Sequence, residues 1–208
     1  MKVLLIVGSP NKKNSTNAAL LEAARGLEDN GVETEIAWIG DDPIKPCTAC
    51  GSCNDTQRCI FGDDDVVNEL IDKLQAADGL IVGSPVYYAG INGALKSVLD
   101  RMFFAAASSF AYKPAGSLVC VRRGGSTSAL DQINKFFLIS QMPVISSFYW
   151  PMVYGQNPEQ VAQDIEGMQC SYQLGVNMAW LLKSLRAAKA AGIEPVRPEA
   201  RAWTNFIR

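Results

Sequence analysis

Four cysteines lie within thirteen residues of this chain and form its most unusual feature. They are Cys47, Cys50, Cys53 and Cys59, in the run PCTACGSCNDTQRC. Thiolates with two, two and five residues between them can converge on one soft metal centre. Because the sequence contains no histidine, any metal site must use sulfur or carboxylate ligands. The motif therefore indicates metal or redox chemistry based on sulfur.

The cysteine spacing favours an iron–sulfur cluster but leaves two other outcomes open. A [4Fe-4S] cluster takes four thiolates, which this motif supplies. A structural zinc also takes four ligands, but usually from two separated pairs, so the overlapping CxxCxxC suits a cluster better. Free or oxidised thiols are the third outcome. The remaining cysteines, Cys120 and Cys170, lie within a predicted strand and a predicted helix, where we expect them to be buried as small apolar residues.

The composition indicates one globular domain spanning residues 1–208. The chain is 48% apolar and 19% charged, which is enough to bury a full core. Its net charge of −2 gives no electrostatic reason to expect a nucleic-acid or membrane partner. No apolar run is long enough to span a membrane, and MKVLLIVGSP is interpreted as a first strand and not as a signal peptide. We expect a cytoplasmic protein, where thiols stay reduced.

Strands and helices alternate along the chain, which predicts a parallel α/β sheet. Apolar or alternating runs predict five strands, at Lys2–Val7, Val32–Ile39, Asp78–Gly83, Gly116–Val121 and Val144–Tyr149. Helical periodicity predicts helices at residues 16–29, from Asp63–Asp65 to about Ala77, at Ile91–Phe104, at Ser128–Gln141 and at 158–191, with Gly167 and Gly175 as candidate breaks. A Cys-rich loop at 43–62 and an irregular tail from about residue 192 complete the chain.

The acidic triplet Asp63–Asp65 is interpreted as the opening of a helix. Carboxylates at a helix N-terminus meet the positive end of the helix dipole. This interpretation is preferred to a metal site built from the three carboxylates.

Ligands of parallel sheets bind beyond the carboxyl ends of the strands, where this sequence has three unusual loops. The first loop, residues 8–17, is rich in hydroxyls and amides, carries two lysines and leads into a helix N-terminus. These groups suit a terminal phosphate. The alternative is a plain capped helix with Ser15 or Thr16 as the N-cap.

The second and third loops suit the flat ring of a nucleotide cofactor. In residues 83–90, Tyr87 and Tyr88 follow a proline and can line a ring, although they could equally pack at the sheet edge. In residues 122–127, two glycines allow close backbone approach and Arg123 brings positive charge, although a glycine turn with solvated arginines fits as well. Together, the three loops fit the phosphate, ring edge and ring face of flavin mononucleotide (FMN).

Four segments resemble the NADPH-dependent FMN reductase and iron–sulfur flavoprotein branch of the flavodoxin-like superfamily. They are GSPNKKNSTNAALL, PCTACGSCNDTQRCIFGDDDV, ADGLIVGSPVYYAGINGALKSVLDR and VRRGG. The resemblance extends to about residue 190. It implies a flavodoxin-like three-layer sandwich with a five-stranded parallel sheet in the order 2-1-3-4-5. It also implies non-covalently bound FMN and a homodimer or homotetramer whose partner chains help to enclose the flavin.

The resemblance also assigns roles by position. The phosphate-binding positions are matched by Ser9, Ser15, Thr16 and Asn17, and Asn11 stands where relatives often have arginine. The loop along the isoalloxazine is matched by Pro85, Val86, Tyr87 and Tyr88. The loop beside the pyrimidine side of the ring is matched by Arg123, Gly124 and Gly125. The cluster ligands are matched by Cys47, Cys50, Cys53 and Cys59, although related flavoproteins with similar loops are often clusterless.

The leading functional hypothesis is an FMN-dependent oxidoreductase. It would pass electrons from NAD(P)H through FMN to a quinone, nitroaromatic, free flavin or iron–sulfur acceptor. The alternative is an electron carrier that uses FMN and a [4Fe-4S] cluster without oxidising nicotinamide, and a third class is a flavin-free scaffold or zinc-binding interaction protein. We assign no catalytic side chain, because the cofactor carries the chemistry. The expected partner is a small-molecule acceptor or a redox protein.

Overall fold

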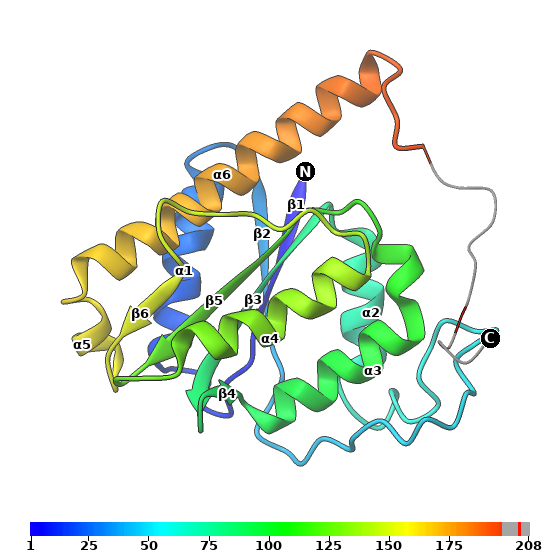
Figure 1. The fold of residues 1–208 in the computed structure, drawn as a ribbon, viewed down its shortest axis with the longest axis horizontal. Helices are drawn as coiled ribbons and strands as arrows, with labels where there is room; N and C mark the ends of the chain where they lie inside the picture. The colour runs from blue at the N-terminus through cyan, green and yellow to red at the C-terminus, as the bar shows by residue number, and fades with distance from the viewer. Residues whose placement is uncertain (197–203, 205–208) are drawn as a thin grey trace.

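The computed structural model describes residues 1–196 and residue 204, and its centre is a parallel β-sheet (Figure 1). Five parallel strands follow the order β2-β1-β3-β5-β6. Their bounds are β1 (Lys2–Val7), β2 (Glu33–Trp38), β3 (Gly79–Tyr87), β5 (Ala115–Val121) and β6 (Met152–Tyr154). The two-residue β4 (Gly90–Ile91) pairs antiparallel with the end of β3. Because β4 lies outside the parallel set, this is the predicted order 2-1-3-4-5, which is confirmed.

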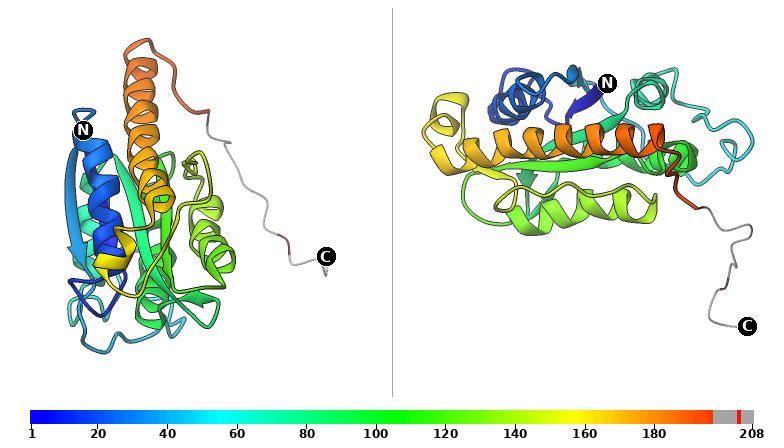
Figure 2. Two further views of the ribbon diagram at one scale, coloured as in Figure 1. Left: turned by 90° about the vertical axis from the view of Figure 1, so that its left-hand side faces the viewer. Right: turned by 90° about the horizontal axis from the view of Figure 1, so that it is seen from above.

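Helices cover both faces of the sheet (Figures 1 and 2). Their bounds are α1 (Ser15–Glu28), α2 (Val67–Ala76), α3 (Gly93–Phe110), α4 (Ser126–Ile139), α5 (Pro158–Val161) and α6 (Ile165–Ala190). Alternate residues of β1 enter different cores: Leu5 packs with α1 and α6, whereas Leu4 and Ile6 pack with α2, α3 and α4. A strand buried on both faces reads as a continuous apolar run, which is why the sequence located β1 so well.

The predicted fifth strand at Val144–Tyr149 is wrong. This segment makes a single bridge, between Val144 and Ala115, and the strand itself is β6. Pro151 immediately precedes β6, and its carbonyl accepts a hydrogen bond from Val119 at 3.1 Å. Proline has no N–H to give but can begin an edge strand in this way. The side chains of Phe148 and Tyr149, which made the segment look like a strand, are exposed.

The helix predicted to open at Asp63–Asp65 begins later, at Val67. The acidic triplet lies in the preceding turn, where Asp65 accepts a hydrogen bond from the Val67 N–H at 3.0 Å through Oδ1. Its other carboxylate oxygen pairs with Arg101. The triplet therefore leads into the helix without forming its first turn.

The long C-terminal helical region is broken, but at neither of the predicted glycines. The break falls between α5 and α6, where Asp164 caps α6 by accepting a hydrogen bond from the Gly167 N–H at 3.0 Å. Gly175 lies inside α6, where an added Cβ would overlap the carbonyl oxygen of Ala23 in α1. Gly175 therefore permits close contact between the two helices. The predicted tail from about residue 192 is irregular as far as residue 196, and most of it lies outside the described residues.

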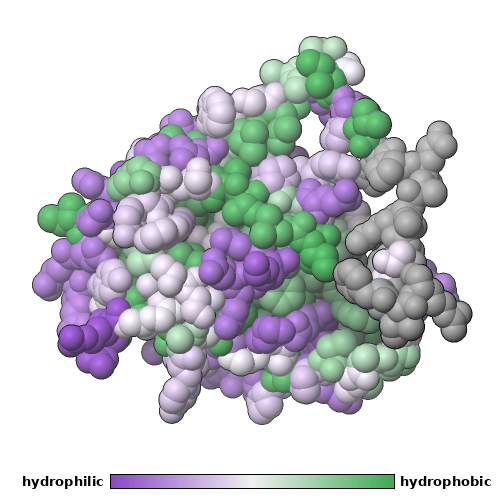
Figure 3. All heavy atoms as spheres, viewed as in Figure 1, coloured by the Kyte–Doolittle hydropathy of each residue, from purple (hydrophilic) through white to green (hydrophobic). Residues whose placement is uncertain are grey.

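Apolar side chains reach the surface around α4, α6 and the segment before β6. Figure 3 shows apolar and polar residues interspersed on the side of the molecule that carries α4 and α6. Large exposed side chains here are Leu138, Ile139, Phe148, Trp150 and Trp180. None of the helices in the described part of the chain is both long and apolar enough to cross a membrane.

Candidate functional site

The three predicted ligand loops meet at the carboxyl ends of β1, β3 and β5, which are neighbours in the sheet. The first loop is tied to the second at its base, because the Gly8 N–H donates to the Gly83 carbonyl at 2.8 Å. The second touches the third at its tip, because a Cβ added to Gly125 would lie 2.6 Å from the Cα of Ala89. The fold thus brings the predicted loops together at one edge.

The first loop is ordered by its own side chains. The hydroxyl of buried Ser9 accepts hydrogen bonds from the Asn11 N–H at 3.2 Å and from the Asn14 side-chain amide. Asn14 is also the N-cap of α1, since its side chain accepts from the Asn17 N–H at 3.0 Å. The predicted N-cap, Ser15 or Thr16, is therefore wrong. The other N–H groups of the first turn have no partner within the helix and remain suited to an anion.

Thr16 gives the first loop an unmatched donor. Its side chain is fully buried, and its hydroxyl lacks a well-formed hydrogen bond within the described structure, although it lies near enough to the Cys120 thiol to lower the pKa of that thiol. A buried hydroxyl without a well-formed hydrogen bond is unfavourable, and at a helix N-terminus a phosphate oxygen could accept a hydrogen bond from it. Sequence reasoning missed Trp38, whose indole N–H donates to the Ser9 carbonyl at 2.7 Å and so fixes the loop. Its position at the end of β2, beside β1, was the available signal.

The second loop is a tight hairpin between β3 and β4. Tyr88 and Ala89 have φ values of 49° and 60°, both left-handed as a two-residue hairpin turn requires. The Tyr88 side chain is fully exposed, and that of Tyr87 is about half exposed. Pro85 and Val86 are partly buried beneath them. Tyr88 therefore does not pack at the sheet edge, and the hairpin presents its aromatic side chains outward.

The third loop leads into α4 through a glycine in the left-handed conformation. Gly125 is the N-cap residue of α4 and has a φ of 91°, which favours glycine. Arg123 and Gly124 are exposed. The guanidinium of Arg123 is thus free to approach a ligand held at this edge of the sheet.

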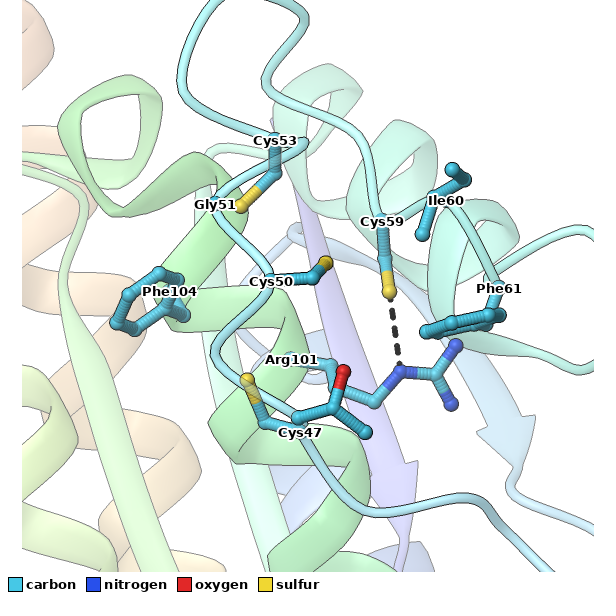
Figure 4. A pocket seen from close by; sticks show the side chains of 10 residues that line it. Cys47, Cys50, Gly51, Cys53, Cys59, Ile60, Phe61, Arg101 and Phe104 are labelled. Atoms are coloured by element: carbon cyan, nitrogen blue, oxygen red, sulfur yellow. Dashed lines mark hydrogen bonds between the residues drawn. The ribbon is translucent and has the colours of Figure 1, made fainter.

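The four cysteines of the motif line one recess against α3 (Figure 4). The recess has about 340 Å³ of empty space, part of it open to solvent, and Phe61, Arg101 and Phe104 complete its wall. Cys47 and Cys50 are exposed, Cys59 is half-buried and Cys53 is buried. Cys120 and Cys170 lie outside the recess, and both are buried as the sequence predicted. Burial raises the pKa of the Cys120 thiol to about 12.

Backbone conformation curves the cysteine loop around its recess. Ala49 and Gly51, on either side of Cys50, have φ values of 52° and 74°. Hydrogen bonding with Ser52 lowers the pKa of the Cys50 thiol, whereas burial raises that of Cys53. The four thiols therefore differ in environment although they share one recess.

The described side chains around the recess are not grouped for a single metal ion. A tetrahedral zinc with Zn–S bonds of about 2.3 Å needs its sulfurs about 4 Å apart. Among the described residues, no three cysteine or acidic side chains are grouped closely enough to hold one ion. Four thiols spread around a common space are the donor set that an iron–sulfur cluster uses.

Cys59 is the cysteine that the surrounding fold holds best. The side-chain amide of Asn68 in α2 accepts from the Cys59 N–H and donates to the Cys59 carbonyl, both at 2.9 Å. Arg101 of α3 donates from Nε to the Cys59 sulfur at 3.1 Å. Burial lowers the pKa of the guanidinium, but bonding to Asp65 and Cys59 outweighs this and raises it overall.

Sequence reasoning missed Arg101, although a signal was present. Within the predicted helix, Arg101 follows Val98 by three positions and precedes Ala105 by four, so the three share one apolar face. A charged residue at such a position needs a buried partner. The partner comes from the cysteine loop, far away in sequence.

This sheet order, with ligand loops at the carboxyl ends of β1, β3 and β5, defines a flavodoxin-like protein. A solved archaeal flavodoxin has the same fold, with a TM-score of 0.60 at 16% identity over 88% of this chain and 99% of that one. The family model of NADPH-dependent FMN reductase matches residues 1–157, and the chain belongs to that family.

Two relatives match over most of their length. An iron–sulfur flavoprotein of Methanocaldococcus jannaschii is 32% identical over 194 residues, which cover 89% of this chain and all of that protein. An iron–sulfur flavoprotein of Methanosarcina thermophila is 32% identical over 175 residues, covering 81% of this chain and 88% of that protein.

Proposed function

We propose that this protein is an electron carrier that binds FMN at the strand ends and a [4Fe-4S] cluster at Cys47, Cys50, Cys53 and Cys59. The observation that carries the proposal is the placement of all four cysteines around one recess. The similarity to proteins named iron–sulfur flavoproteins supports it. The alternative from the sequence is thus better supported than the leading hypothesis of NAD(P)H oxidation.

The chain's own residues would bind and orient the flavin. The phosphate would be held at the N-terminus of α1 by Ser9, Asn11, Ser15, Thr16 and Asn17. The ring would lie along Pro85, Val86, Tyr87 and Tyr88, with Arg123, Gly124 and Gly125 at its pyrimidine side. When bound, FMN supplies transfer of one or two electrons and the cluster transfer of one.

The helix α3 would hold the two proposed sites near each other. Its first residue, Gly93, lies two residues after the hairpin strand β4, and Arg101 lines the cysteine recess. Eight residues of helix span about 12 Å. An electron would therefore have a short path between the flavin edge and the recess. The acceptor would be a redox protein or a small molecule.

A second candidate is reduction of the FMN by NAD(P)H, which the name of the matching family favours. Tyr87 and Tyr88 are exposed to solvent, so a ring bound along them would be open to a nicotinamide. Anaerobic mixing of FMN-loaded protein with NADH or NADPH tests this candidate. Rapid bleaching of the flavin absorbance supports it, and an unchanged spectrum rejects it.

Anaerobic purification tests the leading proposal. We expect iron, sulfide and FMN in the protein, and a broad absorbance beside the flavin bands that dithionite bleaches. Cys50→Ser should remove iron and this absorbance but keep FMN. A protein that takes up no iron after reconstitution, or loses flavin together with iron in the variant, contradicts the two-site proposal.

We also propose that the protein is a homodimer or homotetramer. Support comes from the apolar side chains exposed around α4 and α6, of which Trp180 is 68% exposed. Exposed apolar patches often mark interfaces. Sedimentation velocity at micromolar concentration should show an oligomer, and Trp180→Glu should weaken it. A wild-type monomer would reject this proposal.

A further inference from the structure

Arg101 is a buried cation beside the cysteine recess, and the flavin site does not explain it. Its side chain is only 1% exposed, and that of its partner Asp65 is 13% exposed. A buried guanidinium is unfavourable unless its charge and N–H groups are paired. The contacts of Arg101 therefore give information about the kind of group that the recess can bind.

The contacts of Arg101 are only partly explained by its ion pair. Nη1 donates to the Asp65 carboxylate and, at 3.1 Å, to the Lys45 carbonyl. Nε instead donates to the Cys59 sulfur at 3.1 Å (Figure 4). Nη2 is buried and has no hydrogen-bond partner among the described residues. One N–H is thus directed at a sulfur and another remains to be satisfied, beside a recess lined by four thiols.

A cation that donates to sulfur has a specific effect on a thiolate-bound iron centre. A neutral thiol is only a weak acceptor, whereas a metal-bound thiolate carries negative charge and accepts more strongly. Reduction by one electron makes or breaks no bond but adds one negative charge, which a neighbouring guanidinium stabilises. Hydrogen bonds to sulfur and the local charge are among the features that set cluster potentials.

We propose that Arg101 is a positioning residue that holds the Cys59 sulfur and raises the reduction potential of the cluster, while Asp65 limits this rise. The proposal rests on the proposed function, because it requires a cluster at the four cysteines. Asn68 complements Arg101 by holding the Cys59 backbone.

Redox titration of the anaerobic, FMN-loaded protein with dithionite and mediator dyes tests the proposal, with cluster absorbance and electron paramagnetic resonance as readouts. Arg101→Gln should decrease the ratio of reduced to oxidised cluster at a given potential about tenfold, equivalent to about −59 mV for one electron. Asp65→Asn should shift the potential upward, because it removes a negative charge but keeps the hydrogen-bond acceptor for Val67.

A matched control comes from the same loop. Arg58 is exposed and pairs with Asp72 and Asp63, so Arg58→Gln changes the net charge equally but leaves the Cys59 sulfur untouched. Its titration should match that of the wild type. Arg101→Lys should restore part of the potential lost in Arg101→Gln, because it keeps the charge.

The opposite shifts separate this role from simple support of the loop. A structural role alone would lower the iron content of both Arg101→Gln and Asp65→Asn, or would move the reduction potentials of both variants in the same direction. The proposal is overturned by either of those results, or by wild-type titrations in both variants. If Arg101→Gln alone loses iron, Asp65→Asn and Arg101→Lys decide the matter. A wild-type protein without iron would refute the proposed function and this role with it, whereas intact clusters with unshifted potentials refute only the role.

Discussion

Replacing Gly125 with alanine tests whether contact between the second and third loops builds the flavin site. Gly125 has a φ of 91°, and an added Cβ would lie 2.6 Å from the Cα of Ala89, a backbone atom of the hairpin. The left-handed conformation costs about 1–2 kcal/mol for a residue with a Cβ, and forced overpacking about 1–3 kcal/mol. We expect a total loss of about 2–5 kcal/mol in the free energy of unfolding.

This loss can appear in two measurements. If the hairpin stays in place, urea unfolding of the FMN-free protein will show the strain as a lower midpoint. If the hairpin moves away from the added methyl group, only the backbone cost of about 1–2 kcal/mol will remain in the unfolding free energy, but FMN binding must then restore the original position of the hairpin. A strain of 1.4 kcal/mol weakens binding about tenfold. Titration monitored by flavin fluorescence measures the dissociation constant.

The neighbouring glycine provides the matched control. A Cβ on Gly124 meets nothing within 4 Å, and its φ does not lie in the left-handed region. Gly124→Ala should therefore unfold like the wild type. Gly125→Ala would refute the reasoning if it matched Gly124→Ala within about 0.5 kcal/mol in unfolding and also matched the wild type within about threefold in FMN affinity.

Three further outcomes are expected. Gly175→Ala should lower the unfolding free energy by at least about 2 kcal/mol, because the added Cβ overlaps a backbone carbonyl of α1. Gly93→Ala should not lower it, because a Cβ at Gly93 meets no atom within 4 Å, and urea unfolding compares the two variants. The hydrogen bond and charge of Lys2 lower the pKa of Glu35 below its ordinary value of about 4.3, so this pair stabilises the fold above that pH and stops doing so as pH falls through the lowered pKa. Glu35→Gln should consequently reduce stability at pH 7 and not at pH 2, as unfolding at both pH values would reveal. Cys120 should resist iodoacetamide in the native protein at pH 8, because burial raises its pKa to about 12, and mass spectrometry of labelled peptides detects any exception.

The sequence located the sheet because buried parallel strands leave a local signal. Lys2–Val7 is apolar throughout, since its two faces enter two different cores. The same criterion failed at Val144–Tyr149, where Phe148 and Tyr149 are exposed, while β6 follows Pro151 and has only three residues. An edge strand this short is selected by pairing with β5, which no local pattern reveals.

The residues of the candidate site also differ in whether a local sequence pattern reveals them. The cysteines were recognised because their spacing is local. Arg101 and Asn68 were missed because their partners lie far along the chain, on the cysteine loop. Gly175 was interpreted as a helix break because a glycine that permits close helix packing looks identical in sequence to one that ends a helix. Only the position of α1 distinguishes these two meanings.

The two candidate sites rest on different parts of the fold but share α3. Hydrogen bonds hold the cysteine loop to α2 and α3, through Asn68 and Arg101. The second flavin loop is held at the start of α3, where the Asn92 N–H donates to the Ser84 hydroxyl at 3.1 Å. Losing the cluster should therefore leave the flavin loops in place. Because one helix fixes both ends of the path, a bound cluster would lie at a set separation from the flavin, as electron transfer between them requires.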